Sequence, residues 1–181
     1  MSDDRLKVLA VDLDHTLINT DFIHIGLKLL ISKKFYTLPK LLFIMIFNGK
    51  THAKKYLYDN TNFEISTLPF NVGVINFINQ NKSNYKHIIL ISGSYYKYVK
   101  SVAEYLGLFD SYAGTTIATN MISYNKISYL RETFKNSSFD YIGDSKKDIP
   151  IWEKSDNAFV VNNGSIINHI KHIDYQIISK E

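Results

Sequence analysis

The sequence predicts an α/β fold: a Rossmann-like parallel sheet with helices on both faces and a small helical cap inserted after the first strand. Two observations lead to this class. From residue 71 onward, short apolar segments of strand type alternate with helical segments, which is typical of βαβ units. Between the first apolar strand and this alternation, residues 22–58 show only helical patterns. We therefore expect these residues to lie as an insertion above the sheet edge.

The N-terminal third of the chain predicts one strand followed by three helices. Residues 6–11 form the short apolar run of the first strand. Apolar side chains then recur at helical spacing; Pro39 suits the first turn of a second helix and Asn48-Gly49 its end. A third helix is expected over residues 50–58, and residues 61–69 have the composition of a return connection.

The rest of the chain predicts helices and strands in alternation. Helices are expected over residues 71–81, 95–106, 126–134, 145–154 and 166–172. Strands are expected over residues 86–91, 111–113, 139–142, 158–161 and 175–178. The predicted organisation is a core domain of residues 1–19 and 71–181, with a helical cap of residues 20–70.

The composition indicates a globular domain and excludes several kinds of site. Of the 181 residues, 45% are apolar and 21% are charged. The chain has no cysteine, which excludes disulfides, thiolate metal sites and cysteine nucleophiles. The net charge of +4 suits a small anionic substrate, but it is too small to indicate nucleic-acid binding.

Targeting and membrane-spanning signals are weak. The N-terminus shows no basic-then-apolar leader, so we expect no signal peptide and a cytoplasmic location. The most apolar stretch, residues 38–47, has only about half the length that a helix needs to cross a bilayer. We therefore expect no transmembrane helix.

The segment Asp12-Leu13-Asp14-His15-Thr16 carries the strongest chemical signal. It places two carboxylates where the first strand ends, and this edge of an open α/β sheet is where ligands bind. One carboxylate could attack an electrophile while the other moves protons, and both could help to hold a divalent cation. The alternative is a polar turn, because Asp and Thr are common turn residues.

Later strand ends offer groups that would complete such a site. Ser92-Gly93-Ser94 combines hydroxyls with a glycine that lets the backbone approach an anion, or it is a loop and helix N-cap. Gly143-Asp144 and Asp148 place two carboxylates four residues apart, where they can face one cation or serve only the helix N-terminus. Lys126 begins a helix between these segments, and a lone lysine is more often a solvated surface residue.

Together these four signals resemble, in the same order, the four motifs of the haloacid dehalogenase (HAD) superfamily. Asp12-Leu13-Asp14-His15-Thr16 is similar to the first motif, Ser92 to the second, Lys126 to the third, and Gly143-Asp144 with Asp148 to the fourth. The resemblance is greatest to phosphoserine-phosphatase-like members and to HAD domains associated with UbiA-type prenyltransferases. That finer likeness rests on residues 17–21, 106–110 and 141–152. His15 and Ile127 depart from the pattern, since the family more often has glycine there.

The resemblance implies a Mg²⁺-dependent phosphomonoester hydrolase that acts on a small phosphorylated metabolite. Asp12 would attack phosphorus and form an aspartyl-phosphate. Asp14 would protonate the leaving oxygen and then deprotonate the hydrolytic water. Ser92, Gly93 and Lys126 would hold the phosphoryl oxygens that are not transferred.

The same resemblance implies a ligand set for Mg²⁺. A side-chain oxygen of Asp12, the backbone carbonyl of Asp14 and Asp144 would bind the ion, with Asp148 in support. Thr16 would fix the nucleophile loop. Two alternatives stay open: a phosphotransferase whose acceptor is not water, and a non-catalytic HAD module that senses a phosphorylated ligand or docks at a membrane.

The cap would cover the site and decide substrate specificity. Thr20 and Asp21 are candidates for substrate contact, or they form a helix N-cap pair. The apolar face of residues 35–47 is interpreted as the core of the cap, with peripheral membrane docking as the alternative if that face is exposed. The sequence indicates no oligomeric state.

Overall fold

A single parallel sheet organises the molecule. The computed structural model describes residues 7–135, 137–161 and 164–179. The sheet has six strands in the order β3-β2-β1-β4-β5-β6, and every neighbouring pair is parallel. The strands are β1 Val8–Val11, β2 His87–Tyr95, β3 Ser111–Thr115, β4 Phe139–Gly143, β5 Ala158–Val161 and β6 Tyr175–Ile178. The predicted α/β class with a parallel sheet is confirmed.

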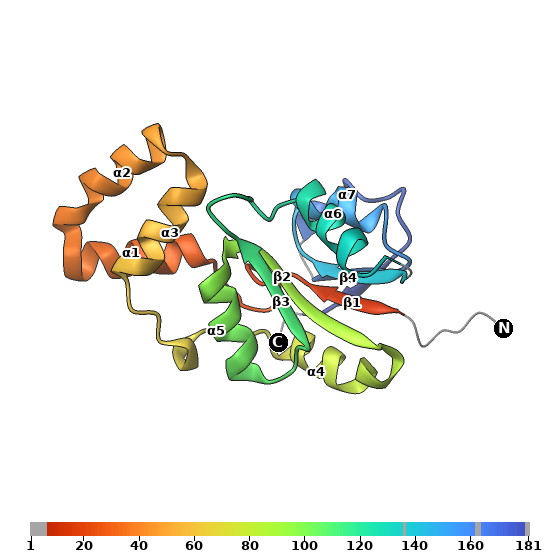
Figure 1. The fold of residues 1–181 in the computed structure, drawn as a ribbon. Helices are drawn as coiled ribbons and strands as arrows, with labels where there is room; N and C mark the ends of the chain where they lie inside the picture. Colours follow the sequence, from red (N-terminus) through yellow and green to blue (C-terminus); the bar gives the residue numbers. More distant parts are fainter. Residues whose placement is uncertain (1–6, 136, 162–163, 180–181) are drawn as a thin grey trace.

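The helices fall into an inserted group and a group that covers the sheet (Figure 1). The inserted helices are α1 Phe22–Lys34, α2 Leu38–Phe47 and α3 Lys50–Asn60. The covering helices are α4 Val72–Asn81, α5 Tyr96–Leu106, α6 Tyr124–Thr133, α7 Ile149–Trp152 and α8 Gly164–Ile167. Single 3₁₀ turns occur at η2 Phe35–Thr37, η3 Ile65–Thr67, η4 Lys82–Asn84 and η5 Lys146–Asp148.

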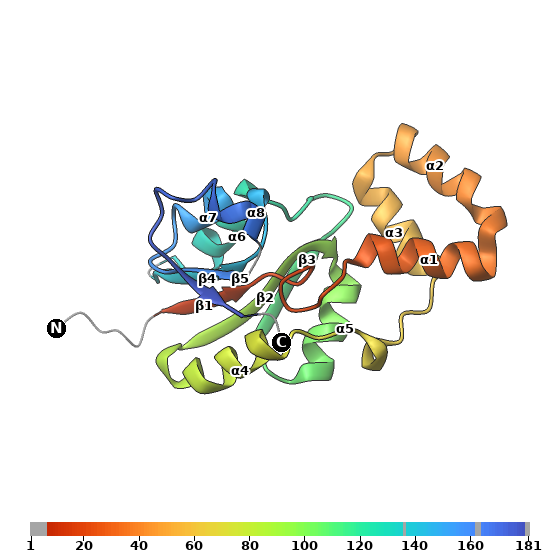
Figure 2. The ribbon, with the colours of Figure 1, turned by 180° about the vertical axis from the view of Figure 1, so that it is seen from behind.

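Alternation along the buried strands divides the core into two layers. On β1, Leu9 and Val11 belong to one apolar cluster, whereas Val8 and Ala10 belong to the other, because successive side chains point to opposite faces. The first cluster includes residues of α4 and α5, and the second includes residues of α6, α7 and α8. Figure 2 shows the same arrangement from behind, with helices on both faces of the sheet. The central strands are therefore buried on both sides, as expected for a parallel sheet.

The inserted helices form a lobe beside the carboxyl end of the sheet (Figures 1 and 2). Asp21 is the N-cap of α1, where its carboxylate accepts a hydrogen bond from the His24 amide at 2.7 Å. A Cβ on Gly26 would lie 2.7 Å from the Leu57 side chain, so glycine permits the close packing of α1 on α3. We refer to these helices, residues 22–60, as the insertion.

Three sequence predictions need correction. Ser92-Gly93-Ser94 does not follow β2 but lies within it, because the strand continues past a register shift until Tyr95 pairs with Thr115 of β3. The helix predicted over 145–154 is divided into η5 and α7, since Pro150 has no amide N–H and fits a first helical turn. The helix predicted over 166–172 is the short α8 instead.

The interpretation of residues 35–47 as cap core is also wrong for much of this segment. No residue of α2 is buried, and its large apolar side chains include several that are more than half exposed. In the part of the chain that the structure describes, every helix falls short of the length and apolar character that a membrane span requires.

Candidate active site

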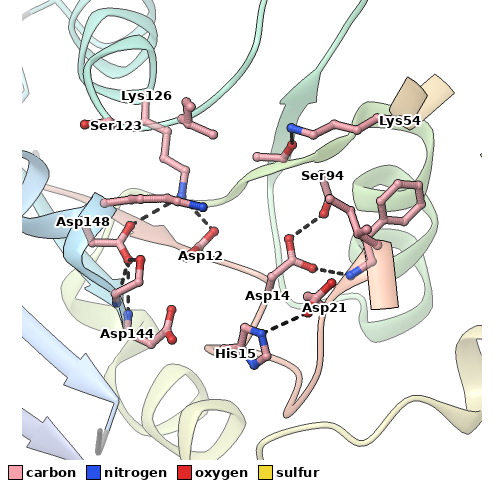
Figure 3. Close-up of a pocket in the computed structure, with 16 residues that line it drawn as sticks. Asp12, Asp14, His15, Asp21, Lys54, Ser94, Ser123, Lys126, Asp144 and Asp148 are labelled. Carbon is pink, nitrogen blue, oxygen red and sulfur yellow. Dashed lines mark hydrogen bonds and ion pairs between the residues drawn. The ribbon is translucent and has the colours of Figure 1, made fainter. Parts of the chain in front are cut away.

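The three central strands bring the polar segments to one edge of the sheet. Val11 of β1 pairs with Leu90 of β2 on one side and with Ile142 of β4 on the other. Because these strands are parallel, the residues that follow them meet at the same edge. A cavity of about 390 Å³ opens there, between the sheet edge and the insertion (Figure 3). It is lined by Asp12, Asp14, His15, Asp21, Phe22, Ile23, Lys54, Gly93, Ser94, Ile122, Ser123, Lys126, Asp144, Ser145, Lys147 and Asp148.

Asp12 lies at the base of this cavity in direct contact with an ammonium group. Its carboxylate Oδ1 accepts a hydrogen bond from Lys126 Nζ at 2.8 Å, and both side chains are buried. Burial raises the pKa of Asp12, Lys126 opposes this, and the neighbouring carboxylates of Asp148 and Asp14 add to the increase. The ammonium therefore compensates only part of the negative charge gathered here.

Lys126 is held by a short chain of hydrogen bonds. Its Nζ donates to Tyr141 Oη at 2.7 Å, and that hydroxyl donates to Asp148 Oδ1 at the same distance. Burial would lower the pKa of Lys126, but Asp12 and Asp148 outweigh it and raise the pKa. Lys126 is therefore a charged side chain held in one position, and the alternative that it is a solvated surface residue is wrong.

Asp148 is fixed from the helical side. Its Oδ2 accepts a hydrogen bond from the Ser145 amide at 3.0 Å, and the Ser145 side chain accepts one from the Asp148 amide, which together form a capping box at η5. The Ser145 hydroxyl also donates to Asp148 Oδ2 at 2.8 Å. A Cβ on Gly143 would lie 2.8 Å from the Asp148 carboxyl carbon, so only glycine leaves room for this arrangement. Both oxygens of Asp148 therefore have protein partners, and its position is closely defined.

Asp12, Asp144 and Asp148 form a buried acidic cluster that fits a divalent cation. One carboxylate oxygen from each residue lies within 4.8 Å of the other two. Thr16, which is fully buried, donates to Asp144 Oδ1 at 3.4 Å and so contacts the cluster through Asp144. Hard carboxylate oxygens are the ligands that Mg²⁺, Ca²⁺ and Mn²⁺ prefer.

Asp14 has a different environment from Asp12. Its Oδ1 accepts a hydrogen bond from the Phe22 amide at 2.9 Å, and its Oδ2 accepts hydrogen bonds from the hydroxyls of Ser92 and Ser94. Burial raises the pKa of Asp14, although these three hydrogen bonds oppose the increase. Its carboxylate lies outside the acidic cluster, consistent with a role in proton transfer.

The second motif is therefore arranged differently from the sequence prediction. Ser92 is fully buried beneath Asp14 and does not line the cavity, whereas Gly93 and Ser94 do. Direct contact of Ser92 with a phosphoryl group stays a prediction. Ser94 received no role of its own from the sequence. The signal that could have identified it is its spacing of two residues from Ser92, which on a strand places both side chains on one face.

The segment Asp12-Leu13-Asp14-His15-Thr16 contains a residue with a strained backbone. His15 adopts a left-handed conformation with a φ of 59°, which explains why glycine is suited to this position. Its ring contacts Asp21 at 3.1 Å, and its amide donates to the Thr20 carbonyl at 2.9 Å. Asp21 thus both caps α1 and lines the cavity, whereas the Thr20 side chain is not part of the lining.

Lys54 is a charged residue of the insertion that reaches the sheet edge (Figure 3). Its Nζ donates to the Gly93 carbonyl at 2.6 Å and to Asn120 Oδ1 at 2.8 Å. Partial burial lowers the pKa of Lys54 to about 8, and Asp14 counteracts only part of this decrease. In the sequence it is half of a lysine doublet, and nothing there distinguishes it from Lys55, which pairs with Asp59 on the surface.

Comparisons with known proteins agree with this architecture. No family model matches the sequence. An uncharacterised protein of Sinorhizobium fredii, y4nM, is 30% identical over 164 residues; the match covers 89% of this chain but only 31% of that protein. A phospho-aspartyl intermediate analogue of phosphoserine phosphatase superposes with a TM-score of 0.66 at 15% identity, covering 98% of this chain and 95% of the other.

A HAD family hydrolase from Salmonella enterica serovar Typhi gives a TM-score of 0.64 at 13% identity, covering 91% of this chain and 65% of the other. The chain therefore has the fold of HAD hydrolases, and that part of the resemblance is confirmed. The finer likeness to UbiA-associated domains stays a prediction.

Proposed function

We propose that this chain is a phosphomonoester hydrolase that requires Mg²⁺ and passes through an aspartyl-phosphate on Asp12. The observation that carries the proposal is the contrast between two carboxylates on one loop. Asp12 contacts the Lys126 ammonium and belongs to the acidic cluster, whereas Asp14 lies outside the cluster and accepts hydrogen bonds only from uncharged donors. Burial raises the pKa of both carboxyl groups, but only Asp12 has an ammonium beside it that favours the charged form. Environments that distinguish two neighbouring carboxylates in this way suit a nucleophile beside a proton donor.

In the first step, a carboxylate oxygen of Asp12 attacks phosphorus. A bond forms between Asp12 and phosphorus, the ester bond to the leaving oxygen breaks, and protonated Asp14 gives its proton to that oxygen. In the second step, Asp14 takes a proton from the attacking water, the Asp12–phosphorus bond breaks, and inorganic phosphate leaves. Asp14 thereby regains the proton that it lost.

The protein's own groups position and compensate charge during these steps. Lys126 holds Asp12 and lies in the cavity wall, where it can also meet a phosphoryl oxygen. The backbone of Gly93 and the hydroxyl of Ser94 line the opposite wall. Positioning and electrostatic stabilisation supply most of the rate in phosphoryl transfer, so this concentration of polar groups fits that reaction.

The acidic cluster would hold the cation. Asp12 and Asp144 would be side-chain ligands, the Asp14 carbonyl would be a third ligand, and Asp148 would support them from the capping box. When bound, Mg²⁺ would offset the repulsion between an anionic nucleophile and an anionic phosphate. Its charge would also favour ionisation of Asp12, which burial alone opposes.

The cavity and the insertion support a small substrate. A volume of about 390 Å³ is at the lower end of ordinary ligand pockets. Lys54 and Asp21 come from the insertion or its start and lie at the cavity, so they are the groups we expect to contact the part of the substrate beyond its phosphate. The architecture shared with phosphoserine phosphatase adds support at the level of the fold.

The test is hydrolysis of p-nitrophenyl phosphate in Mg²⁺, with the wild type compared with Asp12→Asn and Asp14→Asn. Both variants should lose at least about 1,000-fold in kcat, and a chelator should abolish wild-type activity. Asp59→Asn, on the surface of the insertion, is the matched control and should retain activity. Comparable turnover by the wild type and Asp12→Asn would refute the proposal.

A second measurement separates hydrolysis from phosphotransfer. Phosphate release is compared with p-nitrophenol release in the presence of an alcohol acceptor such as glycerol. Equal amounts of the two products indicate transfer to water. A deficit of phosphate, matched by glycerol phosphate, would instead identify a phosphotransferase.

A further inference from the structure

Helix α2 exposes more apolar surface than its position in the fold requires. Apart from Lys40, every residue of α2 is apolar, yet none is buried. Five of its large side chains are about half exposed or more: Leu42, Phe43, Met45, Ile46 and Phe47, with Phe47 at 70%. Phe35 and Tyr36 of η2, which directly precede α2, are exposed to the same degree. A contiguous apolar patch of this kind marks an interaction site.

The exposed side chains are not needed to attach α2 to the insertion. Leu38 and Leu41 are partly buried and pack against the first apolar cluster, which contains Leu9 and Val11. These two leucines form the inward side of the helix. Helix α2 lies at the outer end of the insertion in both views (Figures 1 and 2). Its exposed side chains therefore remain available for a partner.

Positive charge is concentrated in the same part of the chain. Residues 22–60 contain seven lysines and one aspartate, whereas the whole chain has 21 basic and 17 acidic residues. The remainder therefore holds 14 basic and 16 acidic side chains, so the insertion supplies the entire net positive charge. The exposed lysines Lys33 and Lys34 directly precede the apolar patch, Lys40 lies within it and Lys50 follows it.

We propose that the outer face of α2 and η2 docks at an anionic lipid surface. Large apolar side chains would enter the boundary between headgroups and acyl chains, and the surrounding lysines would contact the negative headgroups. This combination of apolar residues with a basic rim is typical of peripheral membrane helices. The inference is independent of the proposed hydrolase activity, because none of these residues lines the cavity.

A second copy of the chain is a poorer occupant for this face. Pairing two identical patches would bring the lysine rims together without acidic partners, since Asp59 is the only carboxylate of the insertion. An anionic bilayer instead offers negative charge across its whole surface. Charge complementarity therefore favours the lipid surface.

Co-sedimentation with vesicles tests the proposal. We expect the protein to bind vesicles of 30% phosphatidylserine in phosphatidylcholine and to bind pure phosphatidylcholine at least about tenfold more weakly, because each lysine near the surface adds to the attraction. The triple variant F43S/I46S/F47S should lose about 100-fold in binding, since three large apolar side chains no longer leave water. The matched control V72S/Y105S/I177S changes three exposed apolar residues elsewhere and should bind like the wild type.

Urea unfolding followed by Trp152 fluorescence and size-exclusion chromatography with light scattering complete the design. A urea midpoint of F43S/I46S/F47S that matches the wild type would show that the variant is folded, so its loss of binding would support the proposal. Absence of vesicle binding by the wild type would overturn it, as would equal binding by the wild type and the triple variant. A wild-type dimer that becomes monomeric in the triple variant would assign the face to a second copy instead.

Discussion

Substitution of Tyr141 by phenylalanine isolates one hydroxyl at the centre of the site. The hydroxyl accepts from Lys126 and donates to Asp148, both at 2.7 Å, and the side chain is fully buried. A hydrogen bond to a charged group contributes about 1.5–3 kcal/mol, so the two together contribute about 3–6 kcal/mol. Lys126 Nζ and Asp148 Oδ1 are 3.7 Å apart and can recover part of this by direct contact. We expect a net loss of about 2–3 kcal/mol in the free energy of unfolding.

That loss corresponds to a decrease in melting temperature of about 4–12 °C for a chain of this size. It is measurable by urea unfolding, because the single tryptophan, Trp152, is buried in α7 and reports on this region. The ring is retained, so no cavity forms and the effect belongs to the hydroxyl. We also expect kcat/KM for p-nitrophenyl phosphate to fall about 10–100-fold, as for other groups that orient the residues of a metal site.

Tyr85→Phe is the matched control for this experiment. The Tyr85 hydroxyl donates to the buried carboxylate of Asp140 at 2.9 Å, but this pair lies at the opposite end of the sheet from the cavity. The control should lower stability by about 1–2 kcal/mol and leave kcat/KM unchanged. A Tyr141→Phe variant with wild-type stability and wild-type kcat/KM would refute the role assigned to the hydroxyl.

Three further predictions concern pH, the insertion and packing at the site. Burial raises the pKa of Asp12 to about 8. With a chelator present, the folded state therefore binds a proton that the unfolded state releases, so stability decreases as the pH rises. The urea midpoint of the wild type should decrease when the pH is raised from 5.5 to 8, and that of Asp12→Asn should decrease less. Lys54→Met should raise KM for p-nitrophenyl phosphate roughly fivefold, which is the equivalent of about one hydrogen bond. The neighbouring variant Lys55→Met should have the same steady-state kinetics as the wild type. Gly143→Ala should lower kcat at least about tenfold in the same assay, since the new Cβ would lie 2.8 Å from the Asp148 carboxyl carbon.

Much of the fold could be predicted because local patterns and long-range packing agree. The predicted bounds of β5 and β6 match the structure, and Gly107 ends α5 in a left-handed conformation, as glycine does at helix ends. The extension of β2 could not be predicted, because it depends on pairing with β3 across a register shift. The exposed face of α2 was misjudged for a related reason: periodicity identifies an apolar helix but does not show what covers it.

The candidate site could be predicted where its groups lie at strand ends. Asp12, Asp14 and Asp144 follow β1 and β4, and parallel pairing is enough to bring them together. Tyr141 and Lys54 could not be found in this way, because a tyrosine within a buried strand and a lysine on a helix have no distinguishing local pattern. Their roles arise from contacts with residues far away in the sequence.

The acidic cluster finally predicts how the free energy of unfolding depends on a divalent cation. Three carboxylates, those of Asp12, Asp144 and Asp148, lie beside one ammonium. A cation that binds only the folded state, and that is present at a concentration of 100 times its Kd, stabilises that state by about 2.7 kcal/mol. Asp144→Asn should remove most of this gain in urea titrations with and without Mg²⁺. Asp140→Asn, a change to a buried carboxylate that is hydrogen-bonded away from the cavity, should lower stability but leave the gain intact. An equal gain in wild type and Asp144→Asn would mean that the cation binds elsewhere.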